Sequence, residues 1–179
     1  MQDTLLATLD TLAKEWRVTL QFRPTEYITR PYITSVLHLT TSNTSSSYDQ
    51  HGDMIPAIFI YGNWPGIPDG LSVRSSVNDK PNYACQFDLL PVNAWTKLEV
   101  GQREDTGQYT FYFSVNGREV RSVINSQPRE FHGVRVYASN PSDPAQPGSI
   151  RNLTVETKVE GGTHPVKPGD DLPHPQTVA

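Results

Sequence analysis

The chain lacks several features that define common classes of protein. It has one cysteine, Cys85, so neither an internal disulfide nor a cysteine-based zinc site can form, and its five histidines are too dispersed for a zinc motif. No apolar run approaches the roughly 20 residues of a membrane-spanning helix. Lys and Arg number 15 against 19 Asp and Glu, a formal net charge of −4. The net charge is therefore negative, unlike the positive charge typical of domains that bind nucleic acid.

Residues 1–6 show no secretory signal. The stretch MQDTLL has neither a basic n-region nor an apolar h-region. The sequence is therefore expected to be either an intracellular protein or a segment of a longer chain.

Motifs for common catalytic chemistries are also absent. Retaining glycoside hydrolysis needs two carboxylates about 5–5.5 Å apart, which a strand supplies through acidic residues at alternating positions. No such string occurs, and the nearest acidic run, REDTG at 103–107, falls in a predicted hairpin loop. There is no Gly-x-Ser-x-Gly elbow. Cys85 shares a predicted strand face with Tyr83 and Phe87, which indicates a buried thiol. We therefore expect that the protein is not an enzyme.

Apolar and polar residues alternate with a period of two along much of the chain, which predicts β-strands. The clearest runs are WRVTLQF (16–22), LSVRSSV (71–77), YACQFDL (83–89) and YTFYFSV (109–115). Shorter apolar runs lie at 35–41, 57–61, 133–139 and 149–157. Between them are turn signals such as Asn116-Gly117, which tolerates the positive φ angles of a type I′ hairpin. About ten or eleven strands without helices predict an all-β antiparallel sandwich or jelly roll of two sheets.

The segment TLLATLDTLAKEW (4–16) is ambiguous. Its leucines and Trp16 recur at helical spacing, and the local pattern alone favours a helix. An isolated short helix fits poorly among so many strands. We therefore predict a strand over 4–9 and a turn over 11–15.

From Glu160 onward the composition changes. Residues 160–179 hold four prolines, three glycines and almost no core-forming side chain. Such a segment cannot bury enough apolar surface to offset its ordering entropy. We therefore predict one domain over 1–159 and a disordered or extended linker or arm over 160–179.

Three stretches have a familiar order: KEWRVTLQFRP (14–24), AWTKLEVGQREDTGQYTFYFSVNGREV (94–120) and GSIRNLTVE (148–156). Together they resemble the early strand, the central unit and the closing strand of the concanavalin A-like superfamily, which includes laminin G-like and pentraxin domains. The resemblance covers residues 4–157 and implies a two-sheet jelly roll. The cysteine pair of laminin G domains and the metal signature of legume lectins are missing, so no sugar or receptor site transfers directly.

Two predicted rim loops carry oxygen ligands of the kind that calcium prefers. The loop at 45–54 contains Asp53, and the loop at 139–148 contains Asn140 and Asp143. In laminin G-like and pentraxin relatives, similar loops form a calcium site at a sheet rim. Asp53, Asp143 and Asn140 are therefore candidate metal ligands, with calcium as the candidate cofactor. Alternatively, Asp53 and Asp143 are Asx-turn residues beside Gly and Pro.

The loop IYGNWPGIPDG (60–70) carries aromatic residues that a regular strand would not easily accommodate. Trp64 lies between Asn63 and Pro65. A loop tryptophan often anchors a ligand or partner, and a sugar face can stack on it. Trp64, Tyr61 and Asn63 are therefore candidate ligand-binding residues. Alternatively, Trp64 folds back as a lid over the open end of the sandwich.

Two asparagines, Asn43 and Asn152, each begin an Asn-x-Ser/Thr glycosylation acceptor. Asn152 alternates with Leu153 and Val155, so its side chain is predicted to point outward. Together with the family resemblance, these acceptors favour an extracellular or cell-surface setting.

These observations predict a non-catalytic extracellular recognition module that binds carbohydrate or a protein partner through rim loops, with calcium as a candidate aid. The alternative is a structural or assembly domain that contacts neighbouring subunits through its sheet faces and its C-terminal arm. Neither prediction includes nucleic acid as a partner or a membrane span in these residues.

Overall fold

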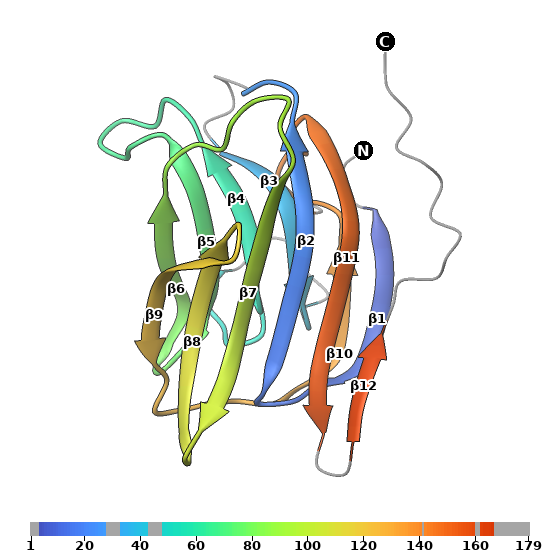
Figure 1. The fold of residues 1–179 in the computed structure, drawn as a ribbon. Helices are drawn as coiled ribbons and strands as arrows, with labels where there is room; N and C mark the ends of the chain where they lie inside the picture. The colour runs from blue at the N-terminus through green and yellow to red at the C-terminus, as the bar shows by residue number, and fades with distance from the viewer. Residues whose placement is uncertain (1–3, 28–32, 43–47, 141, 160–161, 167–179) are drawn as a thin grey trace.

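The computed structural model describes residues 4–27, 33–42, 48–140, 142–159 and 162–166. In these ranges two six-stranded sheets face each other (Figure 1). The strands are β1 (Leu5–Leu12), β2 (Trp16–Pro24), β3 (Ile33–Thr40), β4 (Ala57–Tyr61), β5 (Gly70–Val77), β6 (Lys80–Phe87), β7 (Thr96–Asp105), β8 (Gln108–Val115), β9 (Arg118–Ile124), β10 (Phe131–Tyr137), β11 (Gly148–Val159) and β12 (Gly162–Val166). The described ranges contain no helix that is long and apolar enough to cross a membrane.

The two sheets exchange strands in the manner of a jelly roll. Sheet A has the order β1-β10-β3-β4-β5-β6, and sheet B has the order β12-β11-β2-β7-β8-β9. Strands far apart in sequence lie side by side, such as β11 with β2 and β10 with β3, and these pairs are antiparallel. The expected all-β antiparallel sandwich of two sheets is therefore confirmed.

The core lies between the sheets because alternate residues of each strand point inward. On β2 the buried residues include Trp16, Val18, Leu20 and Phe22, as the sequence pattern predicts. Cys85 of β6 also belongs to this core, and burial raises the pKa of its thiol to about 11. The prediction of a buried thiol is confirmed.

The ambiguous N-terminal segment forms a strand over Leu5–Leu12, so the helical alternative is wrong, and Thr11 and Leu12 belong to the strand rather than to the predicted turn. β1 pairs with β10 along its length, from Leu5 opposite Tyr137 to Leu12 opposite Phe131. The turn that follows is anchored across the sandwich, where the backbone N–H of Ala13 donates to Thr157 Oγ1 at 2.8 Å. Pairing with a distant strand thus overrides a local helical pattern.

The predicted hairpin between β8 and β9 is confirmed. Asn116 has a φ of 51° and Gly117 a φ of 81°, the two positive angles that a type I′ turn requires. The Asn116 side chain also accepts a hydrogen bond from the backbone N–H of Lys97 at 2.9 Å, which ties the turn to β7.

Part of the predicted C-terminal arm continues sheet B. β12 runs antiparallel to β11, from Val159 opposite Gly162 to Val155 opposite Val166. β12 therefore pairs with β11 on the far side of the predicted boundary at residue 159, and the boundary itself stays a prediction. Residues 167–179 lie outside the described ranges.

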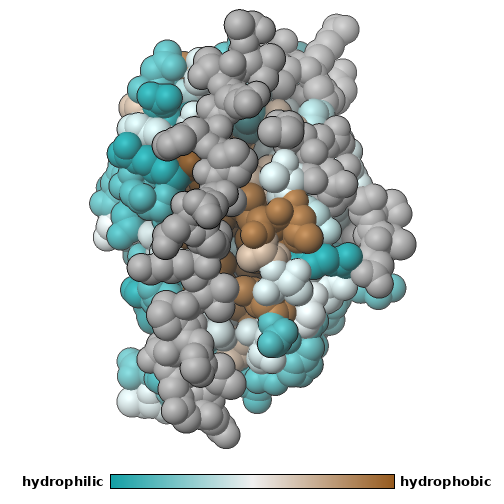
Figure 2. Space-filling view, turned by 90° about the vertical axis from the view of Figure 1, so that its right-hand side faces the viewer, coloured by the Kyte–Doolittle hydropathy of each residue, from teal (hydrophilic) through white to brown (hydrophobic). Residues whose placement is uncertain are grey.

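Each sheet ends in two edge strands. Sheet A ends in β1 and β6, and sheet B ends in β12 and β9. The side of the molecule that carries β1 and β12 is apolar near its middle (Figure 2), and Leu5 of β1 is an exposed hydrophobic residue. β9 lies at the far edge of sheet B, and most of its residues are exposed.

Candidate ligand-binding face on sheet A

The outer face of sheet A, which points away from the core, buries side chains of its own. Every residue of β4 is buried. Ile58 and Ile60 face the core, and Ala57, Phe59 and Tyr61 pack in a second cluster on the outer side. Burial on both sides explains why this strand reads as a continuous apolar run.

Basic and aromatic side chains share this outer face. His38 of β3 and Arg74 of β5 are both cross-strand partners of Ala57, so the three side chains lie in one row. The ring of Phe59 lies edge-on to His38, with centroids 6.2 Å apart. The guanidinium carbon of Arg74 is 5.8 Å from the Phe59 centroid.

Arg74 is the cation at the centre of the face. Its Nη1 donates to Asn82 Oδ1 at 3.0 Å, and its Nη2 donates to the Tyr61 hydroxyl. Its Nε is buried without a partner, and the ion pairs of the described residues do not include Arg74. A buried donor without a partner is costly, so an acceptor that bonds to Arg74 Nε lowers the free energy of the site.

The two rim loops predicted from sequence meet on this face through Tyr48. The Tyr48 hydroxyl donates to Asp143 Oδ2 at 2.5 Å. Asn140 Nδ2 donates to the Tyr48 oxygen at 2.8 Å and to Asp143 Oδ2 at 2.9 Å. The Tyr48 ring lies edge-on to Phe59, with centroids 6.3 Å apart. Asn140 and Asp143 therefore belong to the same face as Tyr61.

Trp64 lies just beyond the end of β4, against Tyr61. The two rings are edge-on with centroids 6.1 Å apart, and Trp64 is 41% exposed. Asn63 has a φ of 54°, and its backbone N–H donates to Asp69 Oδ1 at 2.6 Å, which closes the loop. Trp64 thus rests on the outer cluster and presents its ring to solvent, whereas Tyr61 is buried beneath it.

Burial sets the protonation states on this face. Burial raises the pKa of Tyr48, and the hydrogen bond to Asp143 raises it further. Burial also raises the pKa of Tyr61, although Arg74 acts in the opposite direction. Burial lowers the pKa of His38, whose Nε2 donates to a backbone carbonyl oxygen at 2.7 Å. At neutral pH the two phenols are therefore protonated and the imidazole is neutral.

Asp53 has the geometry of a turn residue. Its Oδ2 accepts a hydrogen bond from the backbone N–H of Gln50 at 2.9 Å, and its own N–H donates to the Gln50 carbonyl. Its carbonyl oxygen accepts the hydrogen bond from His38. Among the residues that the structure describes, no group of three or more His, Cys, Asp or Glu side chains is placed to hold a metal. The assignment of Asp53, Asp143 and Asn140 to calcium stays a prediction from sequence.

We expect the melting temperature to be the same in millimolar calcium and in chelator. A calcium ion would have to displace the Gln50 N–H from Asp53, or Tyr48 and Asn140 from Asp143. Differential scanning fluorimetry measures the result. A ligand at a hundred times its dissociation constant stabilises the folded state by about 2.7 kcal/mol, so a rise of several degrees would contradict this expectation.

Some residues of the candidate sites were predictable from sequence, and others were missed. Asn152 is exposed, at a bulge in β11 with a φ of 53°, whereas Asn43 lies outside the described residues. Arg74 and Tyr48 were missed. Arg74 occupies an outward position of the predicted strand 71–77, so the alternation predicts that its side chain points away from the core. Nothing in the sequence indicates that Tyr48 lies beside Asp143.

No protein-family model and no curated protein matches the sequence. Solved structures of similar fold do match. A heptameric pentraxin from Limulus polyphemus has a TM-score of 0.54 at 13% identity, over 84% of this chain and 67% of that one. A variant of the alginate lyase Aly36B, solved with alginate trisaccharide, has a TM-score of 0.52 at 11% identity, over 89% and 79% of the two chains. At such identity the likeness shows the fold alone. The chain therefore has a two-sheet jelly-roll sandwich fold like that of these two structures, as the sequence resemblance implied.

Proposed function

We propose that the protein is a non-catalytic recognition module that binds carbohydrate on the outer face of sheet A. The observation that carries this proposal is the exposed ring of Trp64 next to the hydrogen-bonded pair of Tyr61 and Arg74. The C–H groups of a sugar ring pack on an aromatic face, which is electron-rich, and the sugar hydroxyls need donors and acceptors beside it. Trp64 supplies the ring, and Asn63 and Arg74 supply polar groups.

The fold supports the carbohydrate-binding part of this proposal by analogy. The alginate lyase Aly36B, which has a similar fold, was solved with a bound trisaccharide. An extracellular or cell-surface setting follows from the proposed role, because glycans are abundant there. The outward position of Asn152 on β11 suits a glycosylation acceptor in that setting.

The chemistry of the face favours binding over catalysis. A general base must be unprotonated near neutral pH. Burial raises the pKa of both Tyr48 and Tyr61, so neither phenol is a base at that pH. The Nε2 of His38 donates to a backbone carbonyl, and its unprotonated Nδ1 is buried away from solvent. The carboxylate of Asp143 already accepts two hydrogen bonds from protein donors.

Trp64→Ala is expected to weaken saccharide binding at least about tenfold, since aromatic anchors at binding sites typically contribute about 2 kcal/mol or more. A glycan array printed with neutral and acidic oligosaccharides identifies a ligand, and isothermal titration calorimetry gives the dissociation constants. Because the side chain is 41% exposed, the melting temperature of the variant should stay within a degree or two of the parent.

Val92→Ala is the matched control, because Val92 is a comparably exposed apolar residue, at 44%, outside this face. It should leave affinity unchanged. Binding that survives Trp64→Ala, or an array without a ligand, overturns the proposal. Shortened oligosaccharides after incubation with the protein would show that the module is catalytic.

A further inference from the structure

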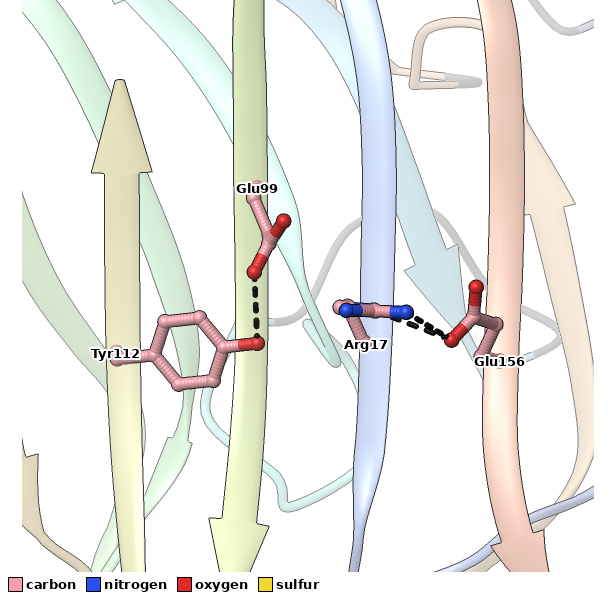
Figure 3. A network of polar contacts seen from close by, with 4 residues as sticks. All are labelled: Arg17, Glu99, Tyr112 and Glu156. Atoms are coloured by element: carbon pink, nitrogen blue, oxygen red, sulfur yellow. Dashed lines mark hydrogen bonds and ion pairs between the residues drawn. The ribbon is translucent and has the colours of Figure 1, made fainter. Parts of the chain in front are cut away.

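The outer face of sheet B carries charges of both signs along its middle, and these are paired. Arg17 of β2 donates from Nε and Nη2 to Glu156 Oε2 of β11, at 3.1 and 2.5 Å (Figure 3). The neighbouring Tyr112 hydroxyl donates to Glu99 Oε1 at 3.0 Å (Figure 3). Each ionised group drawn there has a polar partner from within the sheet.

At one end of the same face the cations are not paired with carboxylates. Gln21 of β2 is the cross-strand partner of both Arg151 on β11 and Lys97 on β7, so the three side chains form one row. Arg23 occupies the next outward position on β2. None of the ion pairs among the described residues includes Arg23, Lys97 or Arg151.

Both arginines lie over the ring of Trp95. The guanidinium carbon of Arg151 is 4.0 Å from the ring centroid, and that of Arg23 is 4.9 Å from it. Arg151 Nε donates to Gln21 Oε1 at 2.7 Å, which fixes its orientation. The Nε of Arg23 is buried and has no hydrogen-bond partner. The sheet thus holds two guanidinium groups in place without neutralising them.

We propose that Arg23, Lys97 and Arg151 form a second binding site, for a sulfate ester carried on a polysaccharide. A sulfate ester presents three terminal oxygens, whereas a planar carboxylate presents two. Three cations from three neighbouring strands therefore match a sulfate ester better than a carboxylate. The charges spread over two strand spacings, on the order of 10 Å, which suits a polymer with repeated anions. Nucleic acid is a poorer fit because the π surface of Trp95, on which a base would stack, is already engaged by arginines.

The test compares dextran sulfate, carboxymethyl dextran and neutral dextran by surface plasmon resonance in 0.15 M salt. The backbone is the same in all three, so the anion alone differs. We expect binding to dextran sulfate, at least tenfold weaker binding to carboxymethyl dextran and none to neutral dextran. Affinity should fall as salt rises, because binding releases counterions.

Arg151→Gln is expected to weaken dextran sulfate binding about tenfold or more, as loss of a charge-assisted hydrogen bond does. Lys97→Gln removes a charge from the site but leaves both arginines on Trp95, and it should weaken binding severalfold. This second variant tests the site even if Arg151→Gln does not fold. Arg17→Gln is the control. It makes the same charge change on the same face, but Arg17 is paired with Glu156, so affinity should change less than twofold.

Three outcomes would overturn this site: no binding to dextran sulfate, equal binding to carboxymethyl dextran, or equal losses in Arg17→Gln and Arg151→Gln. If phosphatidylserine vesicles or single-stranded DNA bound more strongly than dextran sulfate, the three cations would belong to a site for a different partner. Trp64→Ala should retain dextran sulfate binding, because Trp64 lies on sheet A. The proposals for the two sites can therefore be tested and refuted independently.

Discussion

Phe111→Ala is expected to destabilise the protein by about 3–5 kcal/mol, the usual cost of removing a fully buried aromatic ring. Phe111 has an exposed fraction of 0%. Its ring centroid is 6.4 Å from that of Trp16 and 6.0 Å from that of Tyr83. Tyr83 belongs to sheet A and the other two rings to sheet B, so truncation opens a cavity between the sheets. Thermal unfolding should show a fall in Tm on the order of 10 °C.

Ile124→Ala is the matched control for this prediction. Ile124 ends β9 and is 52% exposed, so removing it leaves no internal cavity and should cost less than about 0.5 kcal/mol. Equal effects of the two substitutions would mean that Phe111 does not join the two sheets as described.

Asn125→Ala is expected to cost about 2–4 kcal/mol through hydrogen bonds rather than packing. Asn125 is buried, and its Oδ1 accepts from the backbone N–H groups of Asn78 at 2.8 Å and Gln127 at 3.1 Å. Its Nδ2 donates to Gln102 Oε1 at 2.5 Å, and Gln102 in turn donates to the carbonyl of Lys14 at 2.6 Å. Alanine leaves two N–H groups and one amide oxygen without their partner. Urea unfolding measures the loss in the free energy of unfolding.

Asn125→Asp separates the two halves of this network. The carboxylate keeps an acceptor for the two backbone N–H groups but loses the donor to Gln102, so its effect should lie between those of the parent and the alanine variant. Gln86→Ala, on an exposed position of β6, should be close to neutral. If the aspartate variant were as unstable as the alanine variant, the lost donor to Gln102 and the burial of a carboxylate against Gln102 Oε1 would together outweigh the two retained hydrogen bonds.

The fold was largely predictable because strands carry their own signature. Alternation and short apolar runs located most strands of both sheets, and Asn116-Gly117 indicated the hairpin with its turn type. Two features depended on distant partners. β1 has a helical spacing that only its pairing with β10 overrides, and β12 is a proline-containing stretch that becomes a strand beside β11.

The candidate sites were less predictable because they combine residues that sequence spacing does not relate. Trp64 stood out as an aromatic residue in a turn-rich loop. The contact between Tyr48 and Asp143 joins positions 95 residues apart, and no local pattern reports it. The basic cluster around Trp95 joins three strands through their register, which the sequence does not specify until the sheet order is known.

The exposed edge strand β9 has a consequence for the behaviour of the protein at high concentration. An unpaired edge offers its N–H and C=O groups to any other extended chain, which is a route to aggregation. β9 carries Arg118, Glu119 and Arg121 along its length. A second copy that added a strand beside β9 would have to desolvate these charged side chains. The charges on β9 therefore disfavour the addition of further strands at this edge of sheet B.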